Sequence, residues 1–300
     1  MAVKFTYFYQ LYLLLTVDSI GTCGWDDRRK ERSAIEEEDM DVNGKTVFVT
    51  GGAQGVGRSL VEAVLQKGAK VCIADFNATQ GKTTLTELQE KWGKEKVIFE
   101  ACDVSDSKSF ESSFQKAVSH FGRIDVLVNN AGIVSEKDWE KCINVNFMGV
   151  VRGTMMALEH MRTDRGGHGG VIINTSSTAG LAPGFWVPVY AGTKSAVVNF
   201  TCSWAANPDI TNAGVRLATV CPSGTSTAMI NEAREDQMYH KESFVQVLKK
   251  HGLCDMEHVT GAFMKAIEED SSNGVIFMVT ASGGIQAVKT SFNVIVVDSQ

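Results

Sequence analysis

Four residues of types that suit proton transfer lie in the middle third of the chain, and two of them are one helical turn apart. Lys194 lies four positions after Tyr190, so on a helix over residues 190–206 both side chains project from the same face. Ser177 lies thirteen residues before Tyr190, and Asn146 lies in an earlier expected helix. These residue types predict a proton-transfer site.

The predicted chemistry is the oxidation of a secondary alcohol. Tyrosine is a poor base at neutral pH because its unperturbed pKa is about 10. A neighbouring ammonium group favours the phenolate, so Lys194 is expected to lower the pKa of Tyr190. The phenolate can then accept the hydroxyl proton while a hydride leaves for a nicotinamide. We expect Ser177 to fix the substrate oxygen and Asn146 to hold a proton-relaying water. Each residue alone also suits an ordinary structural role.

A glycine-rich turn provides the place where a dinucleotide would bind. The apolar residues 47–49 have strand-forming side chains, and a helical pattern over about residues 56–66 follows the turn. Glycines allow a tight turn and a close approach of the backbone to a ligand, and the helix directs its positive end at a pyrophosphate. The expected contacts are Gly51, Gln54, Gly55, Val56 and Gly57. A tight turn without a ligand is the alternative.

An acidic residue after the second apolar run predicts NAD rather than NADP. Residues 70–75 end in Asp75, 24 positions after Gly51. A carboxylate there accepts hydrogen bonds from the adenosine ribose and repels a 2′-phosphate. The uncharged Gln54 agrees, and Phe76 follows where an NADP site would favour arginine. The alternative is a surface aspartate that ends a strand.

Strand and helix patterns alternate along the chain, which predicts one α/β domain. We expect a Rossmann-type, doubly wound parallel sheet with helices on both faces, within a catalytic domain over residues 41–285. A tail over residues 286–300 follows. The other expected helices span residues 79–91, 107–121 and 137–160, and the other expected strands span residues 97–102, 124–132, 171–175 and 274–280.

The first 40 residues are expected to be an extension outside this domain. Residues 5–17 are mostly apolar and resemble a secretory signal or a short anchor, and residues 26–41 are dense in charge. The apolar segment is shorter than the about 20 residues of a comfortable bilayer span. Membrane contact is therefore expected only if residues 1–24 are retained. In the alternative, Met40 is the natural start.

Composition and residue spacing argue against nucleic acid and metal ions as partners. The net charge of −6, without a basic stripe, argues against nucleic acid. Seven irregularly spaced cysteines favour buried thiols in a reducing compartment, and six histidines without ligand spacing predict no metal site. Asn174, in a glycosylation sequon, ends an expected buried strand. We therefore expect a cytoplasmic protein, with a secreted or ER-associated one as the alternative.

Taken in order, these motifs resemble the NAD-dependent short-chain dehydrogenases/reductases. The resemblance covers residues 41 to about 280 and implies a homodimer built on the helices of Asn146 and Tyr190. It also implies a role for Tyr190 and Lys194 in cofactor binding, with further contacts from Asp103, Val104, Asn130, Thr225 and Thr227. The matching segments are Thr50 to Gly57, Asp75, Asp103-Val104, Asn129 to Gly132, Asn146, Ser177 and Tyr190 to Lys194.

Within that family, residues 42–45, 120–123, 136–141 and 214–217 resemble the 15-hydroxyprostaglandin dehydrogenases, and related insect alcohol dehydrogenase-like enzymes share much of this pattern. The resemblance implies a hydrophobic alcohol such as a prostaglandin or hydroxy fatty acid, bound at Ser177, Val187 and Tyr190. Val187 stands where those enzymes have a substrate-binding glutamine, and Ser223 replaces a usual glycine. The alternative function is a non-catalytic NAD-binding scaffold.

A substrate lid is expected over residues 226–253. Its apolar wall would suit a lipid-like alcohol, although such a stripe of residues also suits an ordinary core. The expected wall residues are Met229, Ile230, Met238, Tyr239, Phe244, Val247 and Leu248.

Overall fold

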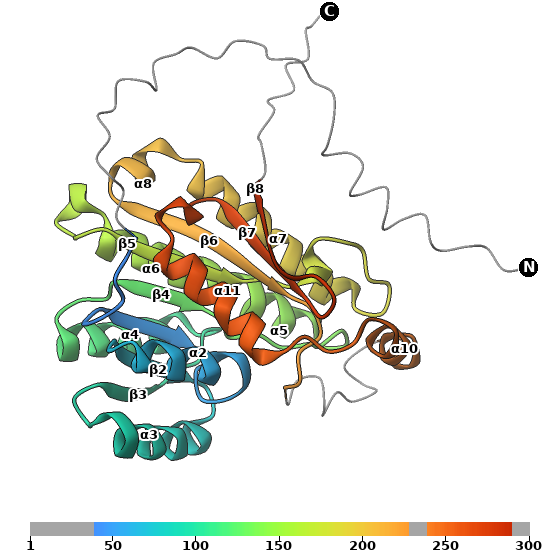
Figure 1. The fold of residues 1–300 in the computed structure, drawn as a ribbon, viewed down its shortest axis with the longest axis horizontal. Helices are drawn as coiled ribbons and strands as arrows, with labels where there is room; N and C mark the ends of the chain where they lie inside the picture. Colours follow the sequence, from blue (N-terminus) through green and yellow to red (C-terminus); the bar gives the residue numbers. More distant parts are fainter. Residues whose placement is uncertain (1–38, 228–238, 290–300) are drawn as a thin grey trace, which may run out of the picture. The chain divides into compact units, whose positions relative to one another are not determined.

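The computed structural model describes residues 39–227 and 239–289, and the strands in these ranges form one eight-stranded sheet (Figure 1). The strand order is β3-β2-β1-β4-β5-β6-β7-β8. Neighbouring strands from β3 to β7 are parallel, and β8 is antiparallel to β7. The strands are β1 (Thr46–Thr50), β2 (Lys70–Asp75), β3 (Val97–Ala101), β4 (Val126–Asn129), β5 (Gly170–Thr175), β6 (Val215–Pro222), β7 (Val275–Thr280) and β8 (Gly284–Lys289).

Helices pack on both faces of the sheet because successive strand residues point to opposite faces. In β1, Val47 and Val49 are buried in a cluster with α2 and α11, whereas Phe48 is buried in a second cluster with α4 and α6. The helices are α2 (Gly55–Gln66), α3 (Ala78–Trp92), α4 (Ser107–Phe121), α5 (Trp139–Ile143), α6 (Gly149–Met161), α7 (Pro188–Ala205), α8 (Pro208–Asn212), α10 (Lys241–His251) and α11 (Met256–Glu268). The doubly wound fold predicted from the sequence is thus confirmed.

The direction of winding reverses at β1. The chain proceeds outward from β1 to β2 and β3, and then returns to β4 on the other side of β1. In open α/β sheets, ligands bind beyond the carboxyl ends of the strands at such a switch point. Expected site residues lie at or just after the carboxyl ends of β1 to β6, so the fold brings them to one edge of the sheet.

Two elements differ in kind from the predictions, and the strand expected over residues 124–132 is the shorter β4. The expected helix over residues 137–160 consists of α5, a π-helical turn (Asn144–Met148) and α6. The expected parallel sheet has an antiparallel edge strand, β8, which takes in part of the segment assigned to the tail. In contrast, the helix predicted over residues 107–121 is α4 with the same bounds.

Several predictions fall outside the described residues. They are the bulk of the amino-terminal extension (1–38), the lid residues Met229, Ile230 and Met238, and the tail beyond residue 289. Of the expected lid, the structure describes the helix α10. Leu248 of this helix packs close to the loop after β6, because a Cβ added to Gly224 would lie 2.4 Å from Leu248 Cδ2. Over the described ranges, the structure has no helix of the length and apolarity needed to cross a bilayer.

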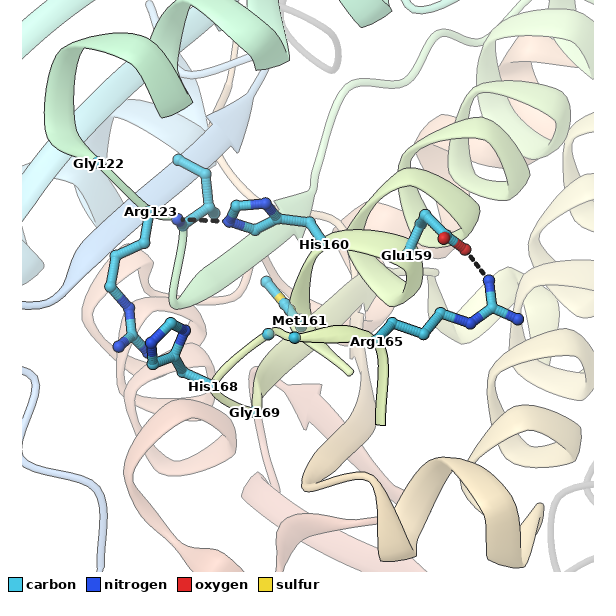
Figure 2. Close-up of a pocket in the computed structure, with 11 residues that line it drawn as sticks. Gly122, Arg123, Glu159, His160, Met161, Arg165, His168 and Gly169 are labelled. Carbon is cyan, nitrogen blue, oxygen red and sulfur yellow. Dashed lines mark hydrogen bonds and ion pairs between the residues drawn. The ribbon is translucent and has the colours of Figure 1, made fainter. Parts of the chain in front are cut away.

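A hollow of about 340 Å³ lies at the opposite, amino-terminal ends of β4 and β5 (Figure 2). Its charged groups are paired within the protein: Arg165 with Glu159, and Arg123 with Asp125 at 2.5 Å. The backbone N–H of Ile124 donates to His160 Nε2 at 3.1 Å. The hollow is therefore separate from the edge at which the expected site residues gather.

Candidate active site

The turn after β1 has the shape expected of a dinucleotide cradle. Gly51 and Gly55 have positive φ values, 64° and 57°, which favour glycine. A Cβ on Gly57 would lie 2.1 Å from the carbonyl oxygen of Gly51, so only glycine allows α2 to begin this close to the turn. The predicted glycine pattern thus reflects both backbone conformation and close packing.

The amino terminus of α2 is open to an anion. Its N-cap residue, Gln54, makes no side-chain capping bond within the described residues, and its first turn contains no acidic residue. No carboxylate of this first turn, which includes Val56, therefore competes with a ligand for its N–H groups. Thr227 comes within 3.4 Å of the position that a Cβ on Gly55 would occupy. These residues fit the pyrophosphate of a dinucleotide, as the sequence predicts.

Asp75 links the second strand to the glycine turn. Its Oδ2 accepts a hydrogen bond from Ala53 N at 3.0 Å, and its Oδ1 accepts one from Asn77 N at 2.9 Å. A carboxylate has about four acceptor positions, so each oxygen retains capacity for a ribose hydroxyl. Phe76, the next expected contact, is 78% exposed and is free to lie against an adenine ring.

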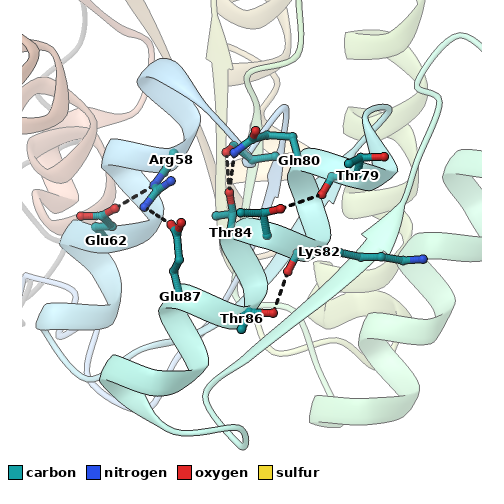
Figure 3. A network of polar contacts seen from close by, with 10 residues as sticks. Arg58, Glu62, Thr79, Gln80, Lys82, Thr84, Thr86 and Glu87 are labelled. Atoms are coloured by element: carbon teal, nitrogen blue, oxygen red, sulfur yellow. Dashed lines mark hydrogen bonds and ion pairs between the residues drawn. The ribbon is translucent and has the colours of Figure 1, made fainter.

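Thr84 of α3 is hydrogen-bonded to the glycine turn, within a network of polar contacts between α2 and α3 (Figure 3). The hydroxyl of Thr84, which is fully buried, donates to the carbonyl of Ala53 at 2.8 Å. On the same side, the guanidinium of Arg58 donates to Glu62 at 3.0 Å and to Glu87 at 2.6 Å. The arginine nearest in sequence to the turn is therefore already paired with two carboxylates.

Asn130 supports the turn through its side chain. Its Nδ2 donates to the carbonyls of Thr50 at 3.0 Å and Gly51 at 3.2 Å.

Asp103 and Val104 shape the loop after β3. Asp103 Oδ1 accepts two hydrogen bonds from Ser105, and Val104 is buried against Gly149. Asn130 and Asp103 thus have positioning roles in this structure, in addition to any contact with the cofactor.

Tyr190, Lys194 and Ser177 meet at the carboxyl end of β5. The Ser177 side chain is close enough to the phenol to act on its pKa, and its hydroxyl donates to Pro222 O at 3.3 Å. Lys194 Nζ lies 5.7 Å from the centre of the Tyr190 ring and donates to Thr175 O at 2.9 Å. The sequence prediction that α7 brings these two side chains to one face is confirmed by this proximity.

In the protein by itself, burial opposes the effect that Lys194 is expected to have on the phenol. Burial raises the pKa of Tyr190 to about 12, although the nearby Ser177 side chain acts to lower it. Burial also lowers the pKa of Lys194 to about 8, despite the opposite effect of the nearby thiols of Cys221 and Cys142. Desolvation is thus the largest influence on both groups, and the Lys194 amine is directed at the backbone carbonyl of Thr175.

Asn146 is fully buried in the π-helical turn. Its Oδ1 accepts from Ile133 N and its Nδ2 donates to Ile133 O, both at 2.8 Å. A Cβ on Gly132 would lie 3.4 Å from both Asn146 Oδ1 and Lys194 Nζ. The side chains of Asn146 and Lys194 thus both approach Gly132, and Asn146 lies beside the lysine as expected from the sequence.

The remaining expected contacts lie close to the site. Val187 is buried and immediately precedes α7. Thr225 is buried and donates to Ser223 O at 3.0 Å, while Ser223 N donates to Val279 O at 2.8 Å. The serine that replaces the usual glycine therefore continues the sheet without a break after Pro222.

Sequence reasoning missed Glu136. Its side chain is 1% exposed, and its carboxylate accepts hydrogen bonds from the N–H groups of Val189 and Tyr190, both at 2.9 Å. The available signal was indirect. The start of α7, at Pro188, follows a valine that cannot cap a helix, so the acceptor has to come from elsewhere in the chain.

Known proteins share this sequence pattern and fold. Residues 45–238 match the family model for short chain dehydrogenase. The chain is 41% identical over 251 residues to human 15-hydroxyprostaglandin dehydrogenase (NAD+), covering 82% of this chain and 94% of that protein. It is 29% identical over 248 residues to the development-specific 25 kDa protein of Sarcophaga peregrina, covering 81% and 95%.

A solved structure supports the same fold. The short chain dehydrogenase/reductase of Burkholderia phymatum, crystallised in complex with NAD, superposes with a TM-score of 0.67 at 24% identity, over 76% of this chain and 86% of that one. The family model spans more than half of the chain, and the similarity to the human enzyme extends over nearly all of that enzyme. This chain therefore belongs to the short-chain dehydrogenase family and is an oxidoreductase that acts on CH–OH groups.

Proposed function

We propose that this protein oxidises a hydrophobic secondary alcohol to a ketone with NAD, and that Tyr190 is the general base. The observation that supports this most directly is the convergence of three side chains: Lys194 Nζ lies 5.7 Å from the centre of the Tyr190 ring, and Ser177 is close enough to the phenol to act on its pKa. All three lie at the same sheet edge as the glycine turn. A substrate hydroxyl placed between Ser177 and Tyr190 could pass its proton to the phenolate oxygen.

The raised pKa of Tyr190 means that the base has to be activated. When bound, NAD+ supplies the hydride acceptor and a positive charge that favours the phenolate. Lys194 contributes in the same direction while it is protonated, which its pKa of about 8 permits at neutral pH. Ser177 orients the substrate oxygen, and its hydroxyl is itself fixed by Pro222 O.

The choice of NAD is supported by the acidic end of β2. Asp75 occupies the position from which a carboxylate accepts ribose hydroxyl groups, and Arg58 is held by Glu62 and Glu87. A 2′-phosphate would therefore meet a negative charge. The human relative is named for NAD+.

A hydrophobic substrate is supported by the aromatic residues around the start of α7. The ring of Phe185 lies 4.9 Å from Trp186 and 5.5 Å from His240, and Tyr239 N donates to Trp186 O at 3.0 Å. Phe185 and Tyr239 are 62% and 59% exposed. We propose an alcohol with an extended apolar chain, such as a hydroxy fatty acid or a prostaglandin, in keeping with the name of the human relative.

We further propose a homodimer and a cytoplasmic location. Met148 and Met155, in the π-helical turn and α6, are 39% and 46% exposed, which suits a partner surface. Buried thiols such as those of Cys72 and Cys102 suit a reducing compartment. Asn174 is fully buried, so a glycan there would not fit the fold. Sedimentation of the purified protein and amino-terminal sequencing of the native protein test these two points.

The test of the activity is NADH formation with a panel of alcohols. The panel comprises a 15-hydroxyprostaglandin, a hydroxylated fatty acid, a hydroxysteroid and a short aliphatic secondary alcohol. With any substrate found, Tyr190→Phe should lower kcat by about 10²- to 10⁴-fold while NADH binding is kept. An unchanged kcat would refute the role of Tyr190. Absence of turnover across the panel would instead favour a non-catalytic NAD-binding scaffold.

A further inference from the structure

Glu136 is a buried carboxylate that binds the backbone of the proposed base. It is 1% exposed and lies in the segment between β4 and α5. Its Oε1 accepts from Tyr190 N and its Oε2 accepts from Val189 N, each at 2.9 Å. Both acceptor atoms are thus used at the first turn of α7, more than fifty residues away in sequence.

The first turn of α7 depends on this acceptor. The first N–H groups of a helix have no partner within the helix, and the N-cap position here is Val187, whose side chain has no acceptor. Pro188 has no N–H group, so Val189 and Tyr190 carry the first donors of the helix. A carboxylate at this end also complements the positive end of the helix dipole.

The same segment is held at a second point by Asn146. Both backbone groups of Ile133 are bound by the Asn146 side chain at 2.8 Å. Residues 133–136 therefore run from one site residue, Asn146, to the backbone of another, Tyr190. A short stretch of chain fixed at both ends leaves little freedom in the distance between those two residues.

Lys194 is held independently of Glu136. Its carbonyl accepts from Ser176 Oγ at 2.7 Å, and its Nζ donates to Thr175 O at 2.9 Å. Loss of the Glu136 carboxylate should therefore loosen the first turn, which contains Tyr190, and leave the next turn in place. The loss of the Glu136 carboxylate is therefore expected to displace the Tyr190 phenol and to leave the Lys194 amine in place.

We propose that Glu136 is a positioning residue, which fixes the Tyr190 backbone so that the phenol stays within reach of Ser177. This inference rests on the proposed dehydrogenase function, because it concerns the base of that reaction. Small displacements of a reacting group are costly: a misplacement of about 1 Å can lower a rate by about 10²-fold.

The test compares matched carboxylate-to-amide changes in the full chain. Glu136→Gln keeps the size of the side chain but directs an NH₂ group at one of the two N–H donors. The control, Asp138→Asn, makes the same change two residues later, where Asp138 Oδ1 accepts from Lys141 N at the start of α5. Each variant is assayed with an alcohol from the panel and NAD, and NADH affinity is measured by fluorescence.

Glu136→Gln should lower kcat by about 10- to 100-fold and leave the NADH Kd within about twofold, because Lys194 stays in place. Asp138→Asn should leave both values within about twofold. Glu136→Ala should lower kcat more than Glu136→Gln does. If Glu136→Ala fails to fold, the result for Glu136→Gln alone tests the proposal. Amide hydrogen exchange should be faster at Val189 and Tyr190 in Glu136→Gln, but unchanged at residues 194–198.

Three results would overturn the positioning role of Glu136 and leave the proposed function intact. The first is an unchanged kcat in Glu136→Gln despite faster exchange at Tyr190. The second is a loss of kcat that is matched by an equal loss of NADH affinity, which would indicate general damage to the fold. The third is unchanged exchange at Tyr190. If the wild type turns over none of the alcohols, the proposed function fails, and the positioning role fails with it.

Discussion

The side chain of Asn146 pairs with both backbone groups of Ile133, as a neighbouring strand would, with two hydrogen bonds of 2.8 Å. This pairing holds the segment after β4 against the π-helical turn. It follows that Asn146 has a structural role as well as the proton-relay role expected from the sequence.

Asn146→Ala should therefore lower the free energy of unfolding as well as activity. It leaves the N–H and carbonyl of Ile133 without these partners, at a cost of about 1 to 3 kcal/mol. Urea unfolding measures the loss. The comparison is Asn77→Ala, which removes the exposed N-cap of α3 and should cost about 1 kcal/mol. An Asn146→Ala variant as stable as the wild type would contradict this account.

Gly57→Ala should abolish NAD binding and destabilise the protein. The added Cβ would meet Gly51 O at 2.1 Å, and neither backbone can move without opening the turn. Gly261→Ala is the control, because it adds a Cβ in α11 at 3.3 Å from Ile285 Cδ1, the far end of a flexible side chain. Its stability should change by less than about 1 kcal/mol. Calorimetric titration with NAD and thermal unfolding check both variants, and retained NAD affinity in Gly57→Ala would be evidence against the cradle.

Asp75→Asn should weaken the preference for NAD over NADP. The amide has a similar shape but lacks the charge that repels a 2′-phosphate. The ratio of kcat/KM with NAD to that with NADP should fall by about 10- to 100-fold, as expected for loss of about 1.5 to 3 kcal/mol of charged interaction. Asp106→Asn, at the exposed N-cap of α4, should leave the ratio unchanged. Equal ratios in wild type and Asp75→Asn would rule out this role.

The lowered pKa of Lys194 predicts a pH-dependent stability. Between about pH 8, its pKa in the folded protein, and its ordinary value of 10.5, the unfolded chain binds a proton that the folded chain does not. Stability should therefore rise with pH in this window, by about 3 kcal/mol in total. Tyr190 acts oppositely, because its raised pKa costs stability only as pH rises from 10 toward 12.

The measurement is urea unfolding of wild type and Lys194→Met from pH 7 to pH 10, below the range in which Tyr190 titrates. The wild-type free energy of unfolding should increase relative to that of the variant as pH rises. Parallel curves would show that Lys194 titrates at its ordinary value.

Sequence reasoning was strongest where chemistry depends on local spacing. The glycines of the turn, Asp75 at the end of β2, and the pair Tyr190 and Lys194 are each set by a few consecutive residues. Strand ends and helix periodicity then fix where such residues lie. For the same reason, α4 could be predicted with its bounds: its buried side chains recur at helical spacing between an aspartate cap and a glycine.

The rest depends on contacts that spacing cannot reveal. The pairing of Glu136 with Tyr190 N joins residues that are distant in sequence, and no pattern in either segment indicates the other. β8 is largely exposed and lacks the apolar run that marks a buried strand, so its order comes from pairing with β7. The pKa of Tyr190 depends on the balance between burial and charge, which only the packed site determines.

The reactivity of two thiols beside the site can be used to measure local opening of the fold. Cys142 and Cys221 are buried, and burial raises the pKa of each, that of Cys221 to about 12. Alkylating agents react with thiolates, so the native protein should protect both sulfurs from modification. The rate at which iodoacetamide labels them would then measure how often the chain around Lys194 opens to solvent, and a tightly bound dinucleotide should slow that labelling.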